Sequence, residues 1–388
     1  MTHDPRPPLD AVSASAPCPP GDADRARRYH RWQLWLSLAR FLLAAAYLLA
    51  LLVTGAAVWL RDAVAGITPL WWNQLALALL ALWGVYRVGT LPLAWASGFW
   101  LPRRFGLLHQ PLPRWLWDLA KATLIGTGLA LLTAEVLYGL LRATPWWWLW
   151  GAAAMFVLQV LIALVAPVWL VPLFYRLTPL GHGELRQRLL RLAAAARVPV
   201  VGVWVVDQSR KSRTANAAVV GLVGTRRILL FDTLLSEFTP EEVEVVLAHE
   251  LAHHVHRDVW RGLLVHAVLG LATLWAADRT LRAGIAILGL STPADLAGLP
   301  LLGLILLGIG GVSLPVGNGW SRRVEREADD FALRMVARPA AFIDAMERLA
   351  ALNLAERDPH PIKEFFLYSH PSIGRRVARA AGMAHRTA

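Results

Sequence analysis

Residues 239–258 read TPEEVEVVLAHELAHHVHRD, and this stretch decides how the rest of the chain is interpreted. The sequence H-E-L-A-H at its centre has the H-E-x-x-H pattern. Residues four apart on a helix share one face, so His249 and His253 can bind one Zn²⁺ at about 2.0–2.1 Å. Glu250 then lies beside the metal, where its carboxylate can take a proton from bound water. The pattern predicts a catalytic zinc site; the alternative is an amphipathic helix with solvated His and Glu.

The residues before the pentad predict the start of a helix. Thr239 and Glu242 form a T-x-x-E capping box, and Pro240 occupies the first helical position. No further Gly or Pro follows before Gly262. We therefore expect a continuous helix from Pro240 that ends at the bilayer surface near Trp260.

The composition indicates a membrane protein. The 388 residues are 56% hydrophobic and only 17% charged, with a mean hydropathy of +0.45. The net charge is +12, but no nucleic-acid-binding motif accompanies it, so no nucleic-acid partner is predicted. The basic residues instead fit flanks beside anionic lipid, which makes the bilayer a predicted partner. Cys18 is the only cysteine, which excludes an internal disulfide.

Six apolar runs are candidates for membrane spans, with five or seven also compatible with the pattern. The fifth run is short for a span. Pro167 and Pro172 should kink the end of the fourth. The runs cover residues 41–60, 70–86, 122–141, 146–174, 262–277 and 297–316.

The distribution of arginine predicts the orientation in the membrane. Arginine clusters lie at 25–31 and 103–114, whereas the alternate loops carry only Arg61 and Arg142. Both termini and the segment that carries the pentad should therefore face the cytoplasm. The Arg-rich, Lys-poor composition suggests a bacterial protein, for which an integral multi-pass position in the inner membrane is expected.

The chain divides into five predicted regions. Residues 1–28 form a disordered cytoplasmic tail and 29–177 an N-terminal transmembrane bundle. Residues 178–260 form the first half of a protease domain, 261–317 two further membrane segments, and 318–388 the second half. The predicted fold is mainly α and polytopic, with six (five to seven) transmembrane helices and a zincin-like α+β catalytic domain split by the last two spans.

Within the first half of this domain, a helix is predicted at 184–197 and a strand at 198–206. A hairpin of strands 217–223 and 228–231 around residues 224–227 should follow. An edge strand ahead of the metal helix can hold a peptide substrate by main-chain pairing.

A third metal ligand is needed, because catalytic zinc sites usually have three protein ligands and a water. His256 lies about 10.5 Å along the helix from His249, which is too far. A better candidate is Glu325, in a segment where Ser321 can cap a helix running to about residue 336. Asp329, one turn later, can accept a hydrogen bond from a zinc histidine. A solvated helix with Arg–Glu pairs remains the alternative.

Three separated motifs resemble the type I CAAX prenyl endopeptidases, which are integral-membrane zinc proteases. The motifs are N-A at 216–217 with GTRRILLFDTLL at 224–235 ahead of H-E-L-A-H, then SRRVEREAD at 321–329, and YSHP at 368–371 with Arg376. The resemblance covers about residues 200–380. Members of that family commonly have seven spans, whereas six apolar runs occur here. A related branch, the bacterial membrane heat-shock zinc proteases, shares the zinc motifs.

The resemblance implies roles for individual residues. It implies one Zn²⁺ per chain, with Glu250 as the general base and Asp329 bonded to a zinc ligand. Asn216 and Ala217 would lie on the strand that binds the substrate. His370 and Arg376 would contact the substrate backbone or the tetrahedral oxyanion. The implied zinc ligands are His249, His253 and Glu325.

The sequence thus predicts a membrane zinc endopeptidase that resembles CAAX prenyl proteases and acts on a peptide or membrane-protein substrate. One rival function is quality control, in which the same chemistry cleaves damaged membrane proteins. A second rival is a non-catalytic scaffold or transporter with a zinc-stabilised domain, for which the intramembrane acid Glu135 would be the best support. A structural zinc needs four protein ligands, and no fourth candidate is found nearby.

Overall fold

The computed structural model describes residues 20–221 and 223–387. Residues 1–19 of the predicted tail lie outside this part. The prediction of disorder is wrong for residues 20–28, because the first helix already begins at Pro20. The charged residues of this stretch precede the apolar run on the same helix, so polarity there marks a helix end rather than a tail.

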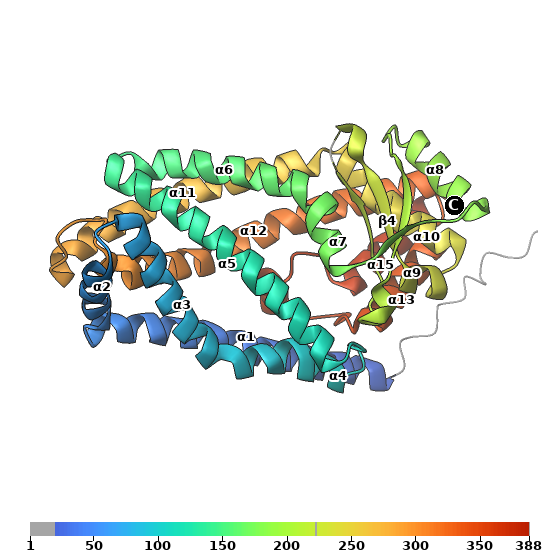
Figure 1. Cartoon of the computed structure of the whole chain (residues 1–388). Helices are drawn as coiled ribbons and strands as arrows, with labels where there is room; N and C mark the ends of the chain where they lie inside the picture. The colour runs from blue at the N-terminus through green and yellow to red at the C-terminus, as the bar shows by residue number, and fades with distance from the viewer. Residues whose placement is uncertain (1–19, 222, 388) are drawn as a thin grey trace, which may run out of the picture.

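Helices dominate the structure, and a small sheet lies in the middle of the chain (Figure 1). The helices are α1 (Pro20–Val53), α2 (Ala56–Ile67), α3 (Trp71–Trp95), α4 (Leu101–Arg104), α5 (Leu112–Ala143), α6 (Trp147–Val165), α7 (Val171–Phe174), α8 (Glu184–Ala195), α9 (Asp232–Glu237), α10 (Pro240–Val255), α11 (Asp258–Leu288), α12 (Leu299–Val336), α13 (Pro339–Asn353), α14 (Pro361–Leu367) and α15 (Ile373–Thr387). The strands are β1 (Leu177–Pro179), β2 (Gly202–Val206), β3 (Ala217–Val220) and β4 (Arg227–Phe231).

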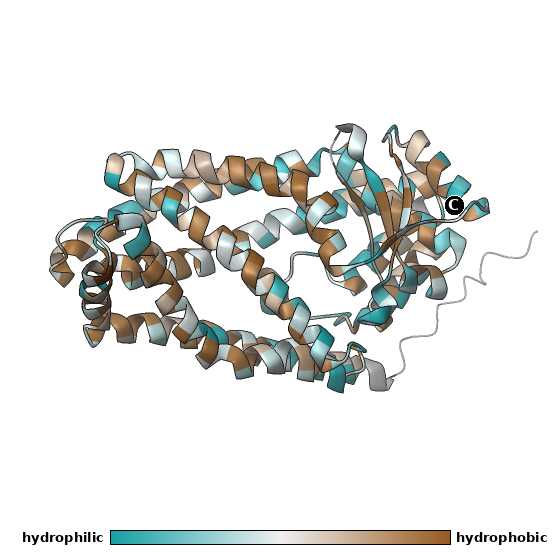
Figure 2. Cartoon of the chain, viewed as in Figure 1, coloured by the Kyte–Doolittle hydropathy of each residue, from teal (hydrophilic) through white to brown (hydrophobic). Residues whose placement is uncertain are grey.

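Six helical segments among the described residues are long and apolar enough to cross a membrane, as predicted. They are Ala23–Val53, Trp71–Arg104, Leu112–Ala143, Trp147–Phe174, Asp258–Leu288 and Leu296–Val336. In Figure 2 the long helices are largely brown (hydrophobic), whereas teal (hydrophilic) residues are more frequent around the sheet. The predicted mainly α, polytopic fold class is therefore confirmed.

The boundaries of two spans differ from the prediction. The run 41–60 is not one helix, because α1 ends at Val53 and Gly55 follows with a left-handed φ of 74°. The residues after it form α2, a separate helix of 12 residues. The fifth run is not short either: α11 has 31 residues and includes polar positions that the apolar count left out.

Helix α12 joins the membrane part to the metal site in one element. It has 38 residues with Pro315 inside it, so Ser321 lies in the helix interior. The prediction that Ser321 caps a new helix is therefore wrong. Because the helix does not stop at the end of its apolar part, residues 321–329 follow directly from the last span in the same helix.

The sheet has the strand order β1-β2-β4-β3. β3 and β4 pair antiparallel, which confirms the predicted hairpin and places β3 at a sheet edge. β2 pairs parallel with β4. The buried core of this part joins the sheet to the helices around it. It includes Ile228 and Leu230 from β4, Leu247 and Leu251 from α10, and Phe342 from α13.

The metal helix α10 begins as predicted. The Thr239 hydroxyl accepts from the N–H of Glu242 at 3.3 Å, and the Glu242 carboxylate accepts from the N–H of Thr239 at 2.7 Å. The helix ends at Val255, earlier than expected, because Arg257 adopts a left-handed φ of 57°. This one residue turns the chain into the membrane helix α11.

Candidate metal centre

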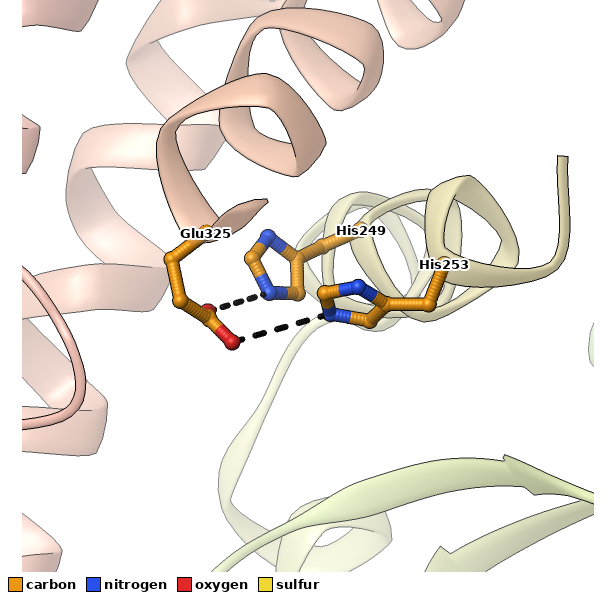
Figure 3. Close-up of side chains that lie close together, drawn as sticks. All are labelled: His249, His253 and Glu325. Atoms are coloured by element: carbon orange, nitrogen blue, oxygen red, sulfur yellow. Dashed lines mark hydrogen bonds and ion pairs between the residues drawn. The ribbon is translucent and has the colours of Figure 1, made fainter. Parts of the chain in front are cut away.

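Three side chains with metal-ligating atoms converge between α10 and α12. One atom each from His249, His253 and Glu325 lies within 4.8 Å of the others. The Nε2 atom of His249 is 3.1 Å from one Glu325 oxygen, and that of His253 is 3.8 Å from the other. Figure 3 shows both imidazole rings directed from α10 toward the Glu325 carboxylate on α12. The spacing on α10 and the direct packing of the two helices create this group.

Each histidine is oriented by a carboxylate at its other nitrogen. The Nδ1 atom of His249 lies 2.9 Å from an oxygen of Asp329, as the sequence predicts. The Nδ1 atom of His253 lies 2.9 Å from an oxygen of Asp258. These contacts favour a proton on each Nδ1, which leaves both Nε2 lone pairs directed at Glu325. This is the tautomer that a histidine needs in order to bind a metal through Nε2.

Asp258 is a site residue that the sequence reasoning missed. It lies five positions beyond His253, which is not a spacing that places two residues on one helix face. The left-handed Arg257 breaks α10 and brings the first residue of α11 back beside the ring. The Asp258 carboxylate also accepts from Arg261 at 2.8 Å. No local sequence signal identifies this contact, because it depends on the turn between two helices.

The electrostatics of the site favour a cation. Burial lowers the pKa of His249, but its contacts with Asp329 and Glu325 outweigh burial and raise that pKa to about 9. The same two carboxylates would stabilise a positive metal ion between the ring and Glu325. With two imidazole nitrogens and one carboxylate oxygen, the donor set matches that of catalytic zinc sites. The residues present therefore fit Zn²⁺.

Arg376 fixes the position of Asp329. Its Nε and Nη2 atoms donate to the two Asp329 oxygens at 2.9 and 2.5 Å. Burial disfavours the charged guanidinium, but the facing Asp329 carboxylate prevails and raises the pKa of Arg376. Nη1 has no hydrogen-bond partner among the described residues, so it remains free to contact another group.

A cavity of about 320 Å³ opens beside the metal ligands. Glu250 lines it, and its carboxylate has no hydrogen bond or ion pair within the described residues. Burial raises the pKa of Glu250. His370 also lines the cavity; its side chain is 60% exposed, and its Nε2 atom lies 3.3 Å from Glu325. Asn216 and Arg376 complete the predicted residues at this cavity.

The remaining candidates lie away from the cavity or serve other contacts. Ala217 is only 2% exposed and does not line the cavity, and its N–H donates to the Asn216 side chain at 2.9 Å. His254 bonds the carbonyl of Val219 at 2.8 Å and so ties α10 to the edge strand β3. His256 is not part of the metal-ligating group, in agreement with the sequence argument.

Comparison with known proteins decides the family. Residues 179–384, more than half of the chain, match the sequence model of peptidase family M48. The chain belongs to peptidase family M48. Residues 13–176 match a second model, described as "CAAX prenyl protease N-terminal, five membrane helices". In that region the described structure has four candidate spans and the short helix α2.

Relatives of this M48 member extend over most of its length. An "Uncharacterized metalloprotease YhfN" of Bacillus subtilis is 29% identical over 335 residues, covering 85% of this chain and 78% of the relative. A "CAAX prenyl protease 1 homolog" of Arabidopsis thaliana is 29% identical over 332 residues, covering 81% of this chain and 76% of the relative.

A solved structure supports the same fold. The crystal structure of S. mikatae Ste24p aligns with a TM-score of 0.79 at 23% identity, covering 92% of this chain and 88% of the other. Together with the family matches, this confirms the resemblance to CAAX prenyl proteases that the sequence predicts. The chain is a membrane protein of the M48 metallopeptidase family.

Proposed function

We propose that the protein is a membrane-embedded zinc endopeptidase that hydrolyses peptide bonds in the cavity beside His249, His253 and Glu325. The observation that carries this proposal is the convergence of three ligand atoms within 4.8 Å beside a cavity that Glu250 also lines. A purely structural zinc would need a fourth protein ligand. The group found among the described residues has three, which leaves a position for water or substrate.

His249, His253 and Glu325 would hold the metal, and Asp329 and Asp258 would keep both imidazole rings oriented toward it. When bound, Zn²⁺ polarises a carbonyl and lowers the pKa of water, which makes water an effective nucleophile near neutral pH. This chemistry needs a nearby base.

Glu250 is the proposed general base. Its carboxylate lines the cavity and is free of partners among the described residues, so it can accept a proton from the attacking water. It would then deliver that proton to the nitrogen of the leaving amine. Burial keeps the pKa of Glu250 above the ordinary glutamate value, which suits a group that must both accept and return a proton.

His370 and Arg376 are proposed to contact the substrate backbone or the developing oxyanion. The exposed ring of His370 faces the cavity. Arg376 holds Asp329 through Nε and Nη2, and its Nη1 has no hydrogen-bond partner in the part of the chain that the structure describes. Asn216 lies at the cavity immediately before the edge strand β3, where a peptide could pair. Ala217 could pair with a peptide through its backbone N–H only after the hydrogen bond from that N–H to the Asn216 side chain is broken.

For the substrate, we propose the C-terminal segment of a prenylated CAAX-type protein or a chemically similar peptide. The match of the membrane part to the CAAX prenyl protease N-terminal model supports this class over damaged membrane proteins. The test compares purified full-length protein on a prenylated peptide, its unprenylated counterpart and a misfolded membrane protein. Faster cleavage of the prenylated peptide is expected; preference for the misfolded protein would favour quality control instead.

We also propose that the metal site and both termini face the cytoplasm, in a bacterial inner membrane. The arginine clusters at 25–31 and 103–114 support this orientation. The single Cys18 offers a direct check. A membrane-impermeant thiol reagent should label it only after cells are opened, and labelling in intact cells would reverse the orientation.

A further inference from the structure

A second cavity, of about 330 Å³, lies where two membrane helices end. One wall is the start of α5, with Arg114, Trp117 and Lys121. The opposite wall consists of the last residues of α7 and the residues just after it. The candidate span Trp147–Phe174 ends with the last residue of α7. The third wall is the loop after β2, which carries Arg210 and Lys211. None of these residues belongs to the metal centre.

The lining of this cavity is strongly basic. One acidic side chain, Asp118, faces five basic ones, which are Arg114, Lys121, Arg176, Arg210 and Lys211. The Asp118 carboxylate already forms two ion pairs, with Lys121 at 2.8 Å and with Lys211 at 2.7 Å. Arg210 is paired with Asp207 at 2.9 Å. The ion pairs formed within the protein therefore leave the lining of the cavity with a net positive charge.

Two guanidinium groups of the lining have no ion-pair partner within the described residues. Arg114 and Arg176 are exposed, and neither side chain has a hydrogen bond or ion pair within residues 20–221 and 223–387. They come from the α5 wall and the α7 wall. A guanidinium presents a fork of donors that matches the oxygens of a phosphate. The cavity thus presents two free phosphate-binding groups beside an already satisfied Lys–Asp–Lys cluster.

The position of the cavity at the ends of two candidate spans indicates the ligand class. Both α5 and the α6–α7 segment are candidate spans, and their ends meet at this cavity. The ends of a membrane-spanning helix lie near the lipid headgroups. Trp117 is 67% exposed at this level, as is usual for tryptophan at a membrane surface. Basic pockets between the ends of membrane helices bind anionic lipid headgroups.

We propose that this cavity binds the phosphate of an anionic phospholipid headgroup, held by Arg114 and Arg176. Such a lipid would connect the membrane bundle to the part of the chain that carries the metal site. Lys211 is bonded to Asp118 on α5, and its carbonyl accepts from the N–H groups of His109 and Gln110. The proposal does not depend on peptide hydrolysis.

The test uses the full-length protein in detergent and measures its melting temperature against added short-chain lipid. Phosphatidylglycerol is the anionic probe, phosphatidylcholine with the same acyl chains is the zwitterionic one, and inorganic phosphate is the lipid-free one. A ligand that binds the folded state raises the melting temperature in a saturable way, from which an apparent Kd follows.

The matched variants remove the same charge from two places. Arg114→Gln/Arg176→Gln removes both unpaired guanidinium groups from the cavity. Arg191→Gln/Arg334→Gln removes two exposed arginines from α8 and the last turn of α12, and neither has a hydrogen bond or ion pair within the described residues. We expect the first pair of substitutions to weaken phosphatidylglycerol binding roughly 10- to 30-fold, because each arginine near a membrane surface should contribute about three- to fivefold to the affinity for an anionic lipid. The second pair should leave binding unchanged, and Arg114→Lys/Arg176→Lys should retain most of it.

Several results would overturn the proposal. These are an unchanged phosphatidylglycerol Kd in Arg114→Gln/Arg176→Gln, an equal loss in Arg191→Gln/Arg334→Gln, or equal binding of phosphatidylcholine. Equal stabilisation by inorganic phosphate would assign the cavity to a free anion instead of a lipid. If the double variant melts abnormally without lipid, the single variants replace it, each with an expected loss of about three- to fivefold.

Discussion

The Glu250 carboxylate lines the cavity without a partner among the described residues. Replacing it by glutamine keeps the shape of the side chain but removes its ability to accept a proton. We expect Glu250→Gln to bind one zinc per chain and to lose peptide cleavage by at least about 10²-fold, the usual contribution of a general base. Metal analysis and a cleavage assay on the same sample provide the measurement.

The control for this variant is Glu237→Gln, an exposed position on α9 outside the cavity. It should retain both zinc and activity. If Glu250→Gln still cleaves peptide at the parent rate, Glu250 is not the base. If it loses zinc as well as activity, its role is structural.

Asp329 contributes through His249 and not through direct contact with the metal. Asp329→Asn keeps a hydrogen-bonding side chain but removes the charge that Arg376 and the imidazole share. We expect zinc affinity to fall about 10- to 100-fold, as for other carboxylates that orient a metal-binding histidine. A competition titration with a metal chelator of known affinity measures this.

The neighbouring Asp330→Asn provides the comparison. Asp330 pairs with Arg379 at 2.5 Å, and within the described residues it has no hydrogen bond or ion pair with the metal ligands. Equal zinc affinity in the Asp329 and Asp330 variants would contradict the proposed orientation of His249.

For individual residues, the sequence identifies most of the candidate metal centre. The i and i+4 spacings place His249 with His253 and Glu325 with Asp329, because each pair lies on one helix. Asp258 could not be predicted in the same way. Its contact with His253 depends on the left-handed turn at Arg257, and nothing in the local sequence requires that conformation.

Among the elements, α10 depends on its N-terminal cap. The Thr239 hydroxyl and Glu242 carboxylate satisfy two backbone N–H groups that would otherwise lack partners. Thr239→Ala should lower the free energy of unfolding by about 1 kcal/mol, whereas Thr239→Ser should restore most of the loss. Thermal or denaturant unfolding in detergent measures both. Equal stability of the two variants would show that the cap contributes little.

Element boundaries were harder to predict than element types. Hydropathy identifies the six spans but not their ends, since helices continue past their apolar parts. Thus α12 extends through Ser321, a residue that is typical of helix starts. Gly55 divides an apolar run that hydropathy alone treats as one span. The β3–β4 hairpin was predictable because its turn residues and alternation are local.

The whole molecule brings together segments from either side of two membrane helices. A zinc ion would bridge α10 and α12 through its ligands and so stabilise their packing. Removing the metal with a chelator should lower the stability by about 2.7 kcal/mol if the free zinc was a hundred times its Kd. The melting temperature of parent and Glu250→Gln should fall alike.

His253→Ala provides the matched control for this experiment. Because it removes a ligand, its melting temperature should not respond to the chelator. An equal response in His253→Ala would place the stabilising metal elsewhere. The sequence supports the existence of this bridge, but the way α12 lies against α10 follows only from the folded membrane part.

The bond between His253 and Asp258 has a mechanical consequence. Asp258 is the first residue of a membrane helix, so any tilt of α11 moves the group that orients a metal ligand. Membrane helices tilt to match bilayer thickness. Zinc affinity should then differ between nanodiscs of short-chain and long-chain lipids, and Asp258→Ala should abolish that difference. Acyl-chain length would in this way regulate the affinity of the metal site through the helix that begins at Asp258.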